Sequence, residues 1–403
     1  MRNRSLLSFV VASCLLAGCG GGDSDLKSTV AVIGDMPYGA SPTDRSQFLA
    51  NPGFINAINL DPDVSLVLHV GDIHSGKEYC TEAYNQAVFN QWVSFRSPVV
   101  YTPGDNEWAD CHKIKEGGGS YNATTGKVDF VVDASGVPVD YAGGDPLANL
   151  QLIRSIYFAT PGKASAGAIP MAVHSQAQEF DVNFPGDKAY VENAWYEQSG
   201  VLFVTLNVPG GSNNDTDPWY GAPTMGAAQA QEVSNRSAAD NRWLDTAFRR
   251  AISNGDRAVV IQIQADMWDL DGAASTHISQ YRQFIDSIAS NAKAFGKPVL
   301  LLNGDAHVYR SDNPLAPGAP CVIEPTPGAA AVACSSASVP SSYGNADPYL
   351  NQPGGYNVPN FRRVTVHGST KPLEWLKLTI DPAANAANGV DAFGPFSWKR
   401  INP

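Results

Sequence analysis

Four stretches of this 403-residue chain end in the same way, with glycine followed by aspartate. Carboxylate and imidazole groups are common ligands of divalent cations, and carboxylates held close together repel one another unless a cation or protons lie between them. A single Gly-Asp step after a strand is ordinarily a turn or a helix cap. Four copies, two of them with a histidine two residues on, favour a metal site instead. The residues concerned are Asp35, Asp72, His74, Asp105, Asp305 and His307.

The segments before these aspartates are apolar runs, such as LVLHV before Gly71 and VLLLN before Gly304. Continuous runs of Val, Ile and Leu bounded by glycine are typical of central strands in a parallel sheet covered by helices on both faces. Functional groups in such sheets gather beyond the carboxyl ends of the strands. Glycine before each aspartate allows a sharp turn and a close approach of a ligand. The four aspartates are therefore expected to meet at one sheet edge.

The remaining pattern predicts a second sheet and several covering helices. Amphipathic helices are expected at residues 47–60, 81–95, 150–158, 238–252 and 279–295. Strands are expected at residues 29–34, 66–70, 98–102, 179–184, 189–195, 201–208, 258–263, 299–302, 362–366 and 375–380, the last two alternating like antiparallel strands. These elements predict an α/β fold (α+β in some schemes), a two-sheet β-sandwich flanked by helices in four layers. We expect one domain over residues 28–403, with insertions near 113–147 and 311–360.

The amino-terminus has the features of an export signal. Two arginines precede an apolar run over residues 6–16, and the sequence Leu-Ala-Gly-Cys that follows resembles a bacterial lipobox. Residues 1–18 are thus expected to be a lipoprotein signal peptide, with Cys19 lipidated and residues 19–27 as a flexible tether. This interpretation places the protein at the bacterial cell envelope, in the periplasm or on the cell surface. Cys14 as the acylated residue, or an ordinary cleaved secretory peptide, are the alternatives.

Charge and hydropathy exclude other classes of partner. Removing residues 1–18 leaves 25 basic and 39 acidic residues, a net charge of −14. The chain has no basic run, which argues against a nucleic-acid scaffold. No later stretch is apolar for 18 residues, so contact with a membrane is expected through the lipidated Cys19 only.

Four cysteines remain in the body of the chain, Cys80, Cys111, Cys321 and Cys334. An even number in an oxidising compartment predicts two disulfides, with three possible pairings. We favour Cys80 with Cys111 and Cys321 with Cys334, because each pair flanks one loop region. Zinc binding is the rival interpretation, but no C-x-x-C spacing supports it.

The motifs together, over about residues 28–310, resemble those of the calcineurin-like metallophosphoesterases. That family has D-x-H, then G-D-x-x, then G-N-H followed by Glu or Asp, then a lone histidine after a strand, then G-H-x-H. Asp35 matches the first aspartate, Asp72 the bridging aspartate, and His307 the last histidine. The resemblance implies metal ions at the strand ends of a β-sandwich and a metal-bound hydroxide that attacks phosphorus. It implies a small phosphoester as the substrate.

This chain departs from the family pattern at five positions. Pro37 and Asn106 stand where histidines are expected, Asp105 replaces a metal-binding asparagine, and Gln264 and Asp305 replace two further histidines. Nitrogen ligands are lost and hard oxygen ligands are gained. Such a site favours one or two ions of manganese, magnesium, iron or calcium over zinc.

The expected ligands fall into two groups that share the bridging carboxylate. Asp35, Asp72 and His307 form the first group, with His74 as a candidate to complete it. The second group contains Asp72, Asp105 and Asp305, with Gln264 or Asp266.

Two residues are expected to act on the substrate. Asn106 can hydrogen-bond an oxygen but cannot give up a proton as histidine can. His74, or a metal-bound water, would then protonate the leaving group. The alternative role for His74 is to hydrogen-bond a residue that ligates the metal, without contacting the metal itself. No spacing singles out the remaining histidines, which include His112, His174, His277 and His367.

Two functions follow from these residues. The first is a metal-dependent phosphodiesterase or phosphatase, which the retained Asp35, Asp72 and His307 favour. The alternative is a catalytically inactive envelope lipoprotein that binds a metal such as calcium, which the histidines missing at positions 37 and 106 favour.

Overall fold

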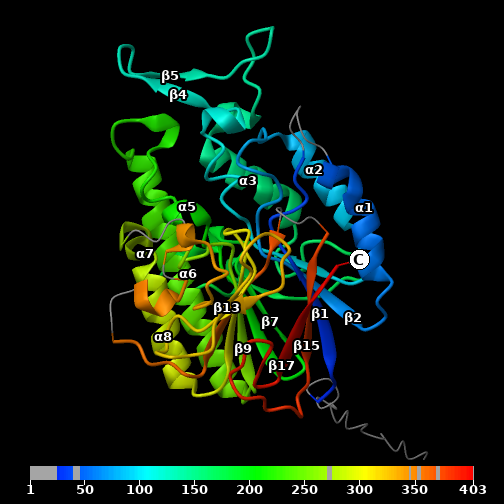
Figure 1. The fold of residues 1–403 in the computed structure, drawn as a ribbon. Helices are drawn as coiled ribbons and strands as arrows, with labels where there is room; N and C mark the ends of the chain where they lie inside the picture. The colour runs from blue at the N-terminus through cyan, green and yellow to red at the C-terminus, as the bar shows by residue number, and fades with distance from the viewer. Residues whose placement is uncertain are drawn as a thin grey trace, which may run out of the picture.

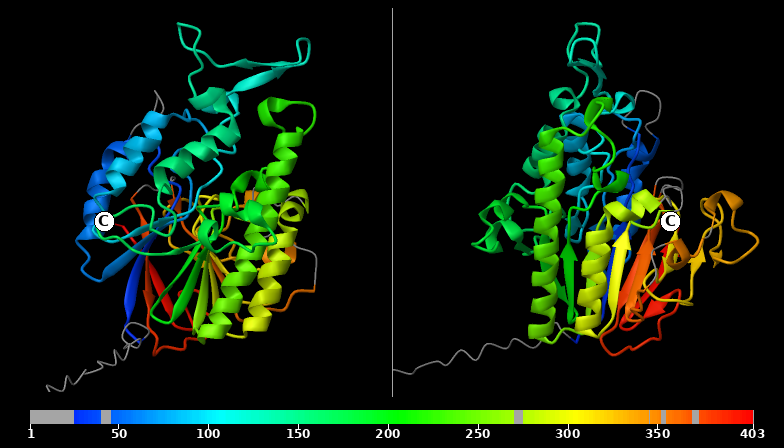
Figure 2. Two further views of the ribbon diagram at one scale, coloured as in Figure 1. Left: turned by 180° about the vertical axis from the view of Figure 1, so that it is seen from behind. Right: turned by 90° about the vertical axis from the view of Figure 1, so that its left-hand side faces the viewer.

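A computed structural model of the chain describes residues 25–39, 46–269, 275–344, 346–351, 355–368 and 373–402. Two sheets lie between two sets of helices, with α1 and α2 on one outer side and α6 and α8 on the other (Figures 1 and 2). The predicted signal peptide and the acylated Cys19 lie outside the described residues.

The first sheet has the strand order β16-β17-β15-β1-β2-β3. Strands β1, β2 and β3 are parallel, whereas β15 runs antiparallel to β1 and β17 antiparallel to β15. Its strands are β1 (Ser28–Ile33), β2 (Val64–His69), β3 (Val99–Tyr101), β15 (Trp375–Ile380), β16 (Ala392–Phe393) and β17 (Phe396–Ile401).

The second sheet has the order β13-β12-β11-β14-β10-β9-β8-β7-β6. Its centre, from β8 through β9 and β10 to β14, is parallel, and its flanking strands are antiparallel. Its strands are β6 (His174–Ser175), β7 (Ala194–Gln198), β8 (Val201–Thr205), β9 (Ala258–Gln262), β10 (Val299–Asn303), β11 (Arg310–Asp312), β12 (Val322–Ile323), β13 (Val332–Ala333) and β14 (Phe361–Thr365).

The helices complete the layers. The longer ones are α1 (Ser46–Asn59), α2 (Glu82–Trp92), α3 (Pro146–Tyr157), α6 (Ala227–Asn254), α7 (Ser275–Gln280) and α8 (Arg282–Phe295). The shorter ones are α4 (Gln176–Glu179), α5 (Gly210–Asn213), η1 (Ile114–Glu116), η2 (Tyr141–Gly144), η3 (Pro185–Ala189), η4 (Trp219–Gly221), η5 (Ser341–Tyr343) and η6 (Pro348–Asn351).

Alternate residues of the central strands enter different cores. Val32 and Leu68 of the first sheet share a buried core with Val260 and Leu300 of the second sheet. Ile33 of β1 instead packs in the core that also holds helix α1 and α2 residues, and the outer face of β9 packs with α6 and α8. Because every central strand is buried on both faces, its sequence is a continuous apolar run. The predicted α/β two-sheet sandwich flanked by helices is confirmed.

Three predicted elements were wrong in detail. Residues 179–184 form no strand; the alternation there belongs to the end of α4 and an exposed turn in which Val182 is 81% exposed. The strand expected at 189–195 begins at Ala194. Strand β14, expected to be antiparallel, pairs in parallel with β10 and antiparallel only with β11.

Helix α6 is much longer than the helix predicted over residues 238–252. Most of the buried residues in its first turns are polar, among them Gln229, Glu232 and Arg236. Arg236 Nε donates to Glu232 Oε1 at 2.6 Å, which satisfies both buried charges. An apolar periodicity could not reveal a helix that buries ion pairs.

The first predicted insertion contains a two-stranded hairpin, β4 (Gly119–Asn122) with β5 (Lys127–Phe130), which projects beyond one end of the body (Figure 1). Both predicted disulfides are confirmed, Cys80 with Cys111 and Cys321 with Cys334. Among the described helices, none combines the length and apolarity that crossing a bilayer requires.

Candidate metal centre

Each predicted aspartate follows the carboxyl end of a strand: Asp35 after β1, Asp72 after β2, Asp105 after β3 and Asp305 after β10. Direct contacts tie the two sheets together here. Asp35 Oδ1 accepts a hydrogen bond from the Asp305 backbone N–H at 2.9 Å and lies 3.2 Å from His307 Nε2. The parallel arrangement of the strands brings these side chains to one edge, as the sequence predicted.

The glycines beside the aspartates are needed for close approach. A Cβ on Gly104 would lie 1.9 Å from Asp72 Oδ1, and one on Gly304 would lie 2.3 Å from Asp35 Oδ2. A Cβ on Gly210, in the turn after β8, would lie 2.6 Å from Asp305 Oδ1 and 2.7 Å from an oxygen of Asp105. Any larger residue at these positions would displace a carboxylate.

The backbone at the site is itself strained. Asp35, Asp72, Asp305 and His307 have φ values of 52°, 58°, 73° and 55°, in the left-handed region that L-residues rarely occupy. Such strain persists only where the surrounding structure enforces it, and it clusters at functional sites.

Asp35, Asp72 and His307 form the first candidate ligand group, with one ligand atom from each lying within 4.8 Å of the others. Asp35 is fully buried, and its Oδ2 has no hydrogen-bond partner among the described residues. A buried carboxylate oxygen without a partner is costly, and a bound cation would satisfy it. The residues present therefore fit a divalent metal.

Tyr38 belongs to this group, although the sequence analysis did not select it. Its hydroxyl donates to Asp72 Oδ2 at 3.4 Å and lies 3.1 Å from His307 Nε2. The signal that could have revealed it is its position three residues after Asp35, on the same turn.

Replacing Tyr38 with phenylalanine is expected to weaken metal affinity by about 10- to 100-fold, the usual cost of losing a group that supports metal ligands. Calorimetric titration with Mn²⁺ would measure it. Tyr196→Phe is the matched control, because the buried Tyr196 hydroxyl has no hydrogen-bond partner among the described residues and lies in the core between the sheets. Equal affinities in both variants would exclude Tyr38 from the site.

The second predicted group is built differently from expectation. Gln264 donates from Nε2 to Asp105 Oδ1 at 3.1 Å, and its Oε1 accepts from the Gly210 N–H. Gln264 thus holds Asp105, and its role as a metal ligand stays a prediction. Asp266 contributes its backbone N–H to Asp305 Oδ2 at 2.9 Å, while its carboxylate pairs with the fully buried Arg363. Asp105 and Asp305 are the carboxylates left to bind a second ion with Asp72.

Burial and mutual repulsion dominate the electrostatics. Burial raises the pKa of Asp72 well above its usual value, and the charges of Asp105 and Glu107 raise it further. Burial and Asp110 raise the pKa of Asp105 to about 7, and burial with Asp105 also raises the pKa of Asp305. Burial lowers the pKa of His307, but hydrogen bonding to Asp35 outweighs it, so the pKa rises. A cation would reverse the repulsion among these carboxylates.

The metal-free protein is therefore expected to lose stability as pH rises from 6.5 to 8.5. Asp105 has a raised folded pKa of about 7, so the folded state binds more protons than the unfolded state below that pH. The pKa values of His69 and His74, lowered to about 4 by burial, act in the opposite direction only below about pH 6.5.

Thermal unfolding in the presence of a chelator would measure this dependence. Asp105→Asn should reduce it and Mn²⁺ should reduce it further, while the part due to Asp140 and Asp256, whose pKa values burial raises to about 8 and about 7, should remain. A melting temperature that rises over this range in the metal-free protein would contradict the assignment.

Asn106 and His74, the predicted catalytic residues, occupy different surroundings. Asn106 Nδ2 donates to Asp72 Oδ2 at 3.0 Å, so Asn106 lies at the site. His74 lies beside the disulfide, with Nε2 3.7 Å from Cys80 Sγ, and its ring meets Tyr84 edge-on. Burial lowers the pKa of His74 to about 4, so the ring is neutral at neutral pH. The role of His74 stays a prediction.

Two other residue clusters are unsuited to metal. His74 lies near Cys80 and Cys111, but both sulfurs are used in the disulfide. Asp110, His112 and Asp217 also come together, but Lys113 Nζ lies 2.5 Å from Asp110 Oδ2 and 3.3 Å from Asp217 Oδ2. The ammonium group already supplies the positive charge there.

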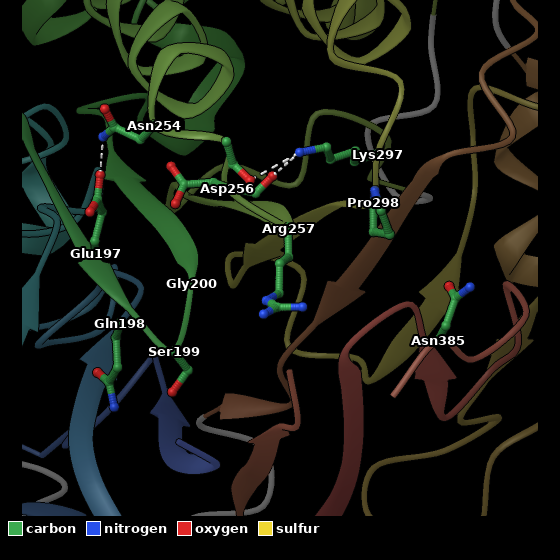
Figure 3. A pocket seen from close by; sticks show the side chains of 11 residues that line it. Glu197, Gln198, Ser199, Gly200, Asn254, Asp256, Arg257, Lys297, Pro298 and Asn385 are labelled. Atoms are coloured by element: carbon green, nitrogen blue, oxygen red, sulfur yellow. Dashed lines mark hydrogen bonds between the residues drawn. The ribbon is translucent and has the colours of Figure 1, made fainter. Parts of the chain in front are cut away.

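A hollow of about 840 Å³ lies at the opposite edge, where β8, β9 and β10 begin (Figure 3). Its lining includes Glu197, Asp256 and Lys297, and the Lys297 ammonium donates to the backbone carbonyls of Gly255 and Asp256. None of the predicted site residues lines it.

No protein-family model matches this chain, and no curated protein sequence does. Among solved structures, it is similar to the purple acid phosphatase PPD1 from yellow lupin (Lupinus luteus) seeds, with 12% sequence identity and a TM-score of 0.41. The match covers 94% of this chain and 52% of the lupin chain, so this chain spans about half the length of that protein. A similarity at this level carries no inference about function.

Proposed function

We propose that this chain is a metal-dependent hydrolase of phosphoesters, a phosphodiesterase or phosphatase of the calcineurin-like metallophosphoesterase type. The observation that supports the proposal is the meeting of Asp35, Asp72, Asp105, Asp305 and His307 at the strand ends of a two-sheet sandwich. The motif resemblance supports the same activity.

One or two divalent cations held by these residues would lower the pKa of water and withdraw charge from the phosphoryl oxygens. Asp72 would contribute to both ligand groups, since it lies with Asp35 and His307 and interacts with Asp105. Asn106, fixed by its bond to Asp72, can donate the second hydrogen of its amide to a phosphoryl oxygen. Oxygen-rich ligands favour manganese, magnesium, iron or calcium over zinc.

Hydrolysis of an aryl phosphodiester and an aryl phosphomonoester with added Mn²⁺ tests the proposal. We expect turnover that a chelator abolishes and that Asp72→Asn abolishes as well. Asp181→Asn, on an exposed turn, should leave turnover intact. Wild-type protein that binds metal but hydrolyses neither ester would contradict the proposal.

That same outcome would support the second candidate, an inactive metal-binding envelope protein. The observation that favours it is Asn106, which stands at the carboxylates without an ionisable proton. Metal binding together with turnover would exclude it.

We further propose that the chain is exported and anchored through Cys19. Two disulfides are typical of an oxidising compartment. Strand β1 begins at Ser28, on the edge opposite the carboxylates, so an anchor before it would attach at the end of the body away from the site. Cys19→Ser should move the protein from the membrane fraction to the soluble fraction; unchanged partition would contradict the anchor.

A further inference from the structure

Ser212 and His277 form a hydrogen-bonded pair beside the metal centre. Ser212 Oγ lies 3.1 Å from His277 Nδ1, and His277 Nε2 lies 3.1 Å from the carbonyl oxygen of Asp266. A carbonyl oxygen can only accept, so Nε2 carries a hydrogen. In the neutral ring Nδ1 is then an acceptor, and the Ser212 hydroxyl donates to it. The Asp266 carbonyl fixes the tautomer, as orienting groups do in other serine–histidine pairs.

The backbone that carries Ser212 is unusual. Gly211, Ser212, Asn213 and Asn214 have φ values of 53°, 57°, 62° and 61°, which make a turn of left-handed helix. That conformation is unfavourable for L-residues, although asparagine tolerates it better than serine. Buried groups enforce the turn: the Asn213 N–H donates to the Tyr281 hydroxyl at 2.9 Å, and Arg236 Nη1 donates to Asn213 Oδ1 at 2.6 Å.

This turn lies directly over the second ligand group. A Cβ on Gly210 would collide with Asp305 and Asp105, and one on Gly211 would lie 3.3 Å from Asp105 Oδ2. The Ser212 Cα is two residues on from Gly210, so it lies within about 8 Å of it. Asp305 accepts from the N–H of the same residue, Asp266, whose carbonyl contacts His277. Ser212 is partly exposed, as a residue that meets a substrate must be.

The two side chains expected to act on the substrate are poor candidates as proton donors, which leaves a metal-bound water or another side chain for that role. Asn106 has no ionisable proton, and the neutral ring of His74 is buried beside the disulfide. A poor leaving group, such as an alkoxide, cannot depart without a proton.

We propose that Ser212 protonates the leaving oxygen and that His277 resupplies the serine, an inference that rests on the proposed function. When the phosphorus–oxygen bond breaks, its electron pair goes to the leaving oxygen, which takes the Ser212 hydroxyl proton. In the reacting form His277 is protonated, so its Nδ1 donates to Ser212 Oγ and the serine hydrogen is directed to the leaving oxygen. Ser212 then takes that Nδ1 proton, and the imidazole is left neutral with its Nε2 hydrogen on the Asp266 carbonyl. Water returns a proton to the ring. The substrates served by this relay are phosphoesters of ordinary alcohols.

If the Ser212 hydroxyl had only a structural role, its removal would lower the turnover of all substrates alike. The dependence of the loss on the leaving group is therefore the decisive measurement. Turnover of an alkyl ester and a nitrophenyl ester with the same phosphoryl group should be compared. In Ser212→Ala and His277→Gln, we expect losses of about 100-fold or more for the alkyl ester and of less than about 3-fold for the nitrophenyl ester, whose leaving group needs no proton.

Matched controls are Ser234→Ala, on the exposed face of α6, and His174→Gln, an exposed histidine that stacks on Trp195. Equal losses on both esters in Ser212→Ala, or no loss on the alkyl ester, would overturn the relay while leaving the hydrolase intact. If the wild-type protein hydrolysed neither ester, the proposed hydrolase function would be contradicted, and the proposed relay with it.

A second readout does not depend on activity. In the metal-free protein, imidazole ¹⁵N resonances should identify His277 as the Nε2–H tautomer, and Ser212→Ala should shift its Nδ1 resonance whereas Ser234→Ala should not. A His277 ring protonated only at Nδ1 would contradict the geometry from which the relay is inferred.

Discussion

Asp72→Asn is expected to reduce phosphoester turnover by at least about 100-fold, because loss of a direct bridging ligand should exceed the 10- to 100-fold cost of losing a supporting group. Asp72 lies with Asp35 and His307 of the first ligand group, interacts with Asp105 of the second group, and accepts a hydrogen bond from Asn106 Nδ2 at 3.0 Å. Initial rates at saturating Mn²⁺ would measure the loss.

The isosteric amide keeps this test free of unfolding. Asparagine tolerates the left-handed backbone of residue 72, where φ is 58°. Burial and neighbouring carboxylates raise the pKa of Asp72, so a neutral side chain should leave the metal-free protein at least as stable. Asp72→Asn with wild-type turnover would remove Asp72 from the centre.

Removing the Cys80–Cys111 disulfide, with alanine at both positions, is expected to lower the free energy of unfolding by about 3–4 kcal/mol, from the loop-closure entropy of the 31-residue separation. Activity should fall as well. Both sulfurs lie near the backbone carbonyl of Asn106, at 3.3 Å and 3.6 Å, so the bridge fixes the turn that carries Asp105 and Asn106. Urea unfolding and turnover would measure the two effects.

The Cys321–Cys334 pair provides the matched comparison. Its separation of 13 residues predicts a cost of about 3 kcal/mol, and its loop includes none of the proposed ligands. Alanine at these two positions should leave turnover per folded molecule unchanged. An equal loss of activity in both double variants would show that general stability, not the position of Asn106, determines the effect.

The central strands and their aspartates were predictable because their signals are local. A strand that is buried on both faces has an apolar run as its sequence. A turn that passes close to a carboxylate requires a glycine, as at Gly104 and Gly304. The disulfide pairings followed from cysteines that flank single loops.

The missed features depend on contacts between distant segments. Tyr38 contacts His307, which lies 269 residues away in the sequence. Arg363 pairs with the carboxylate of Asp266, 97 residues away in the sequence, so that this carboxylate is engaged outside the centre. The Ser212–His277 pair joins two loops whose sequences show no motif. The first half of α6 escaped detection because it buries charged side chains in pairs.

Metal content of the purified protein, expressed without its first 19 residues and exported so that disulfides form, tests the central claim most directly. The account predicts one or two equivalents of manganese, iron or another divalent ion, retained in Asp181→Asn and reduced in Asp72→Asn. If no metal binds even at millimolar supply, the four carboxylates are structural turns, and the proposed hydrolase is contradicted.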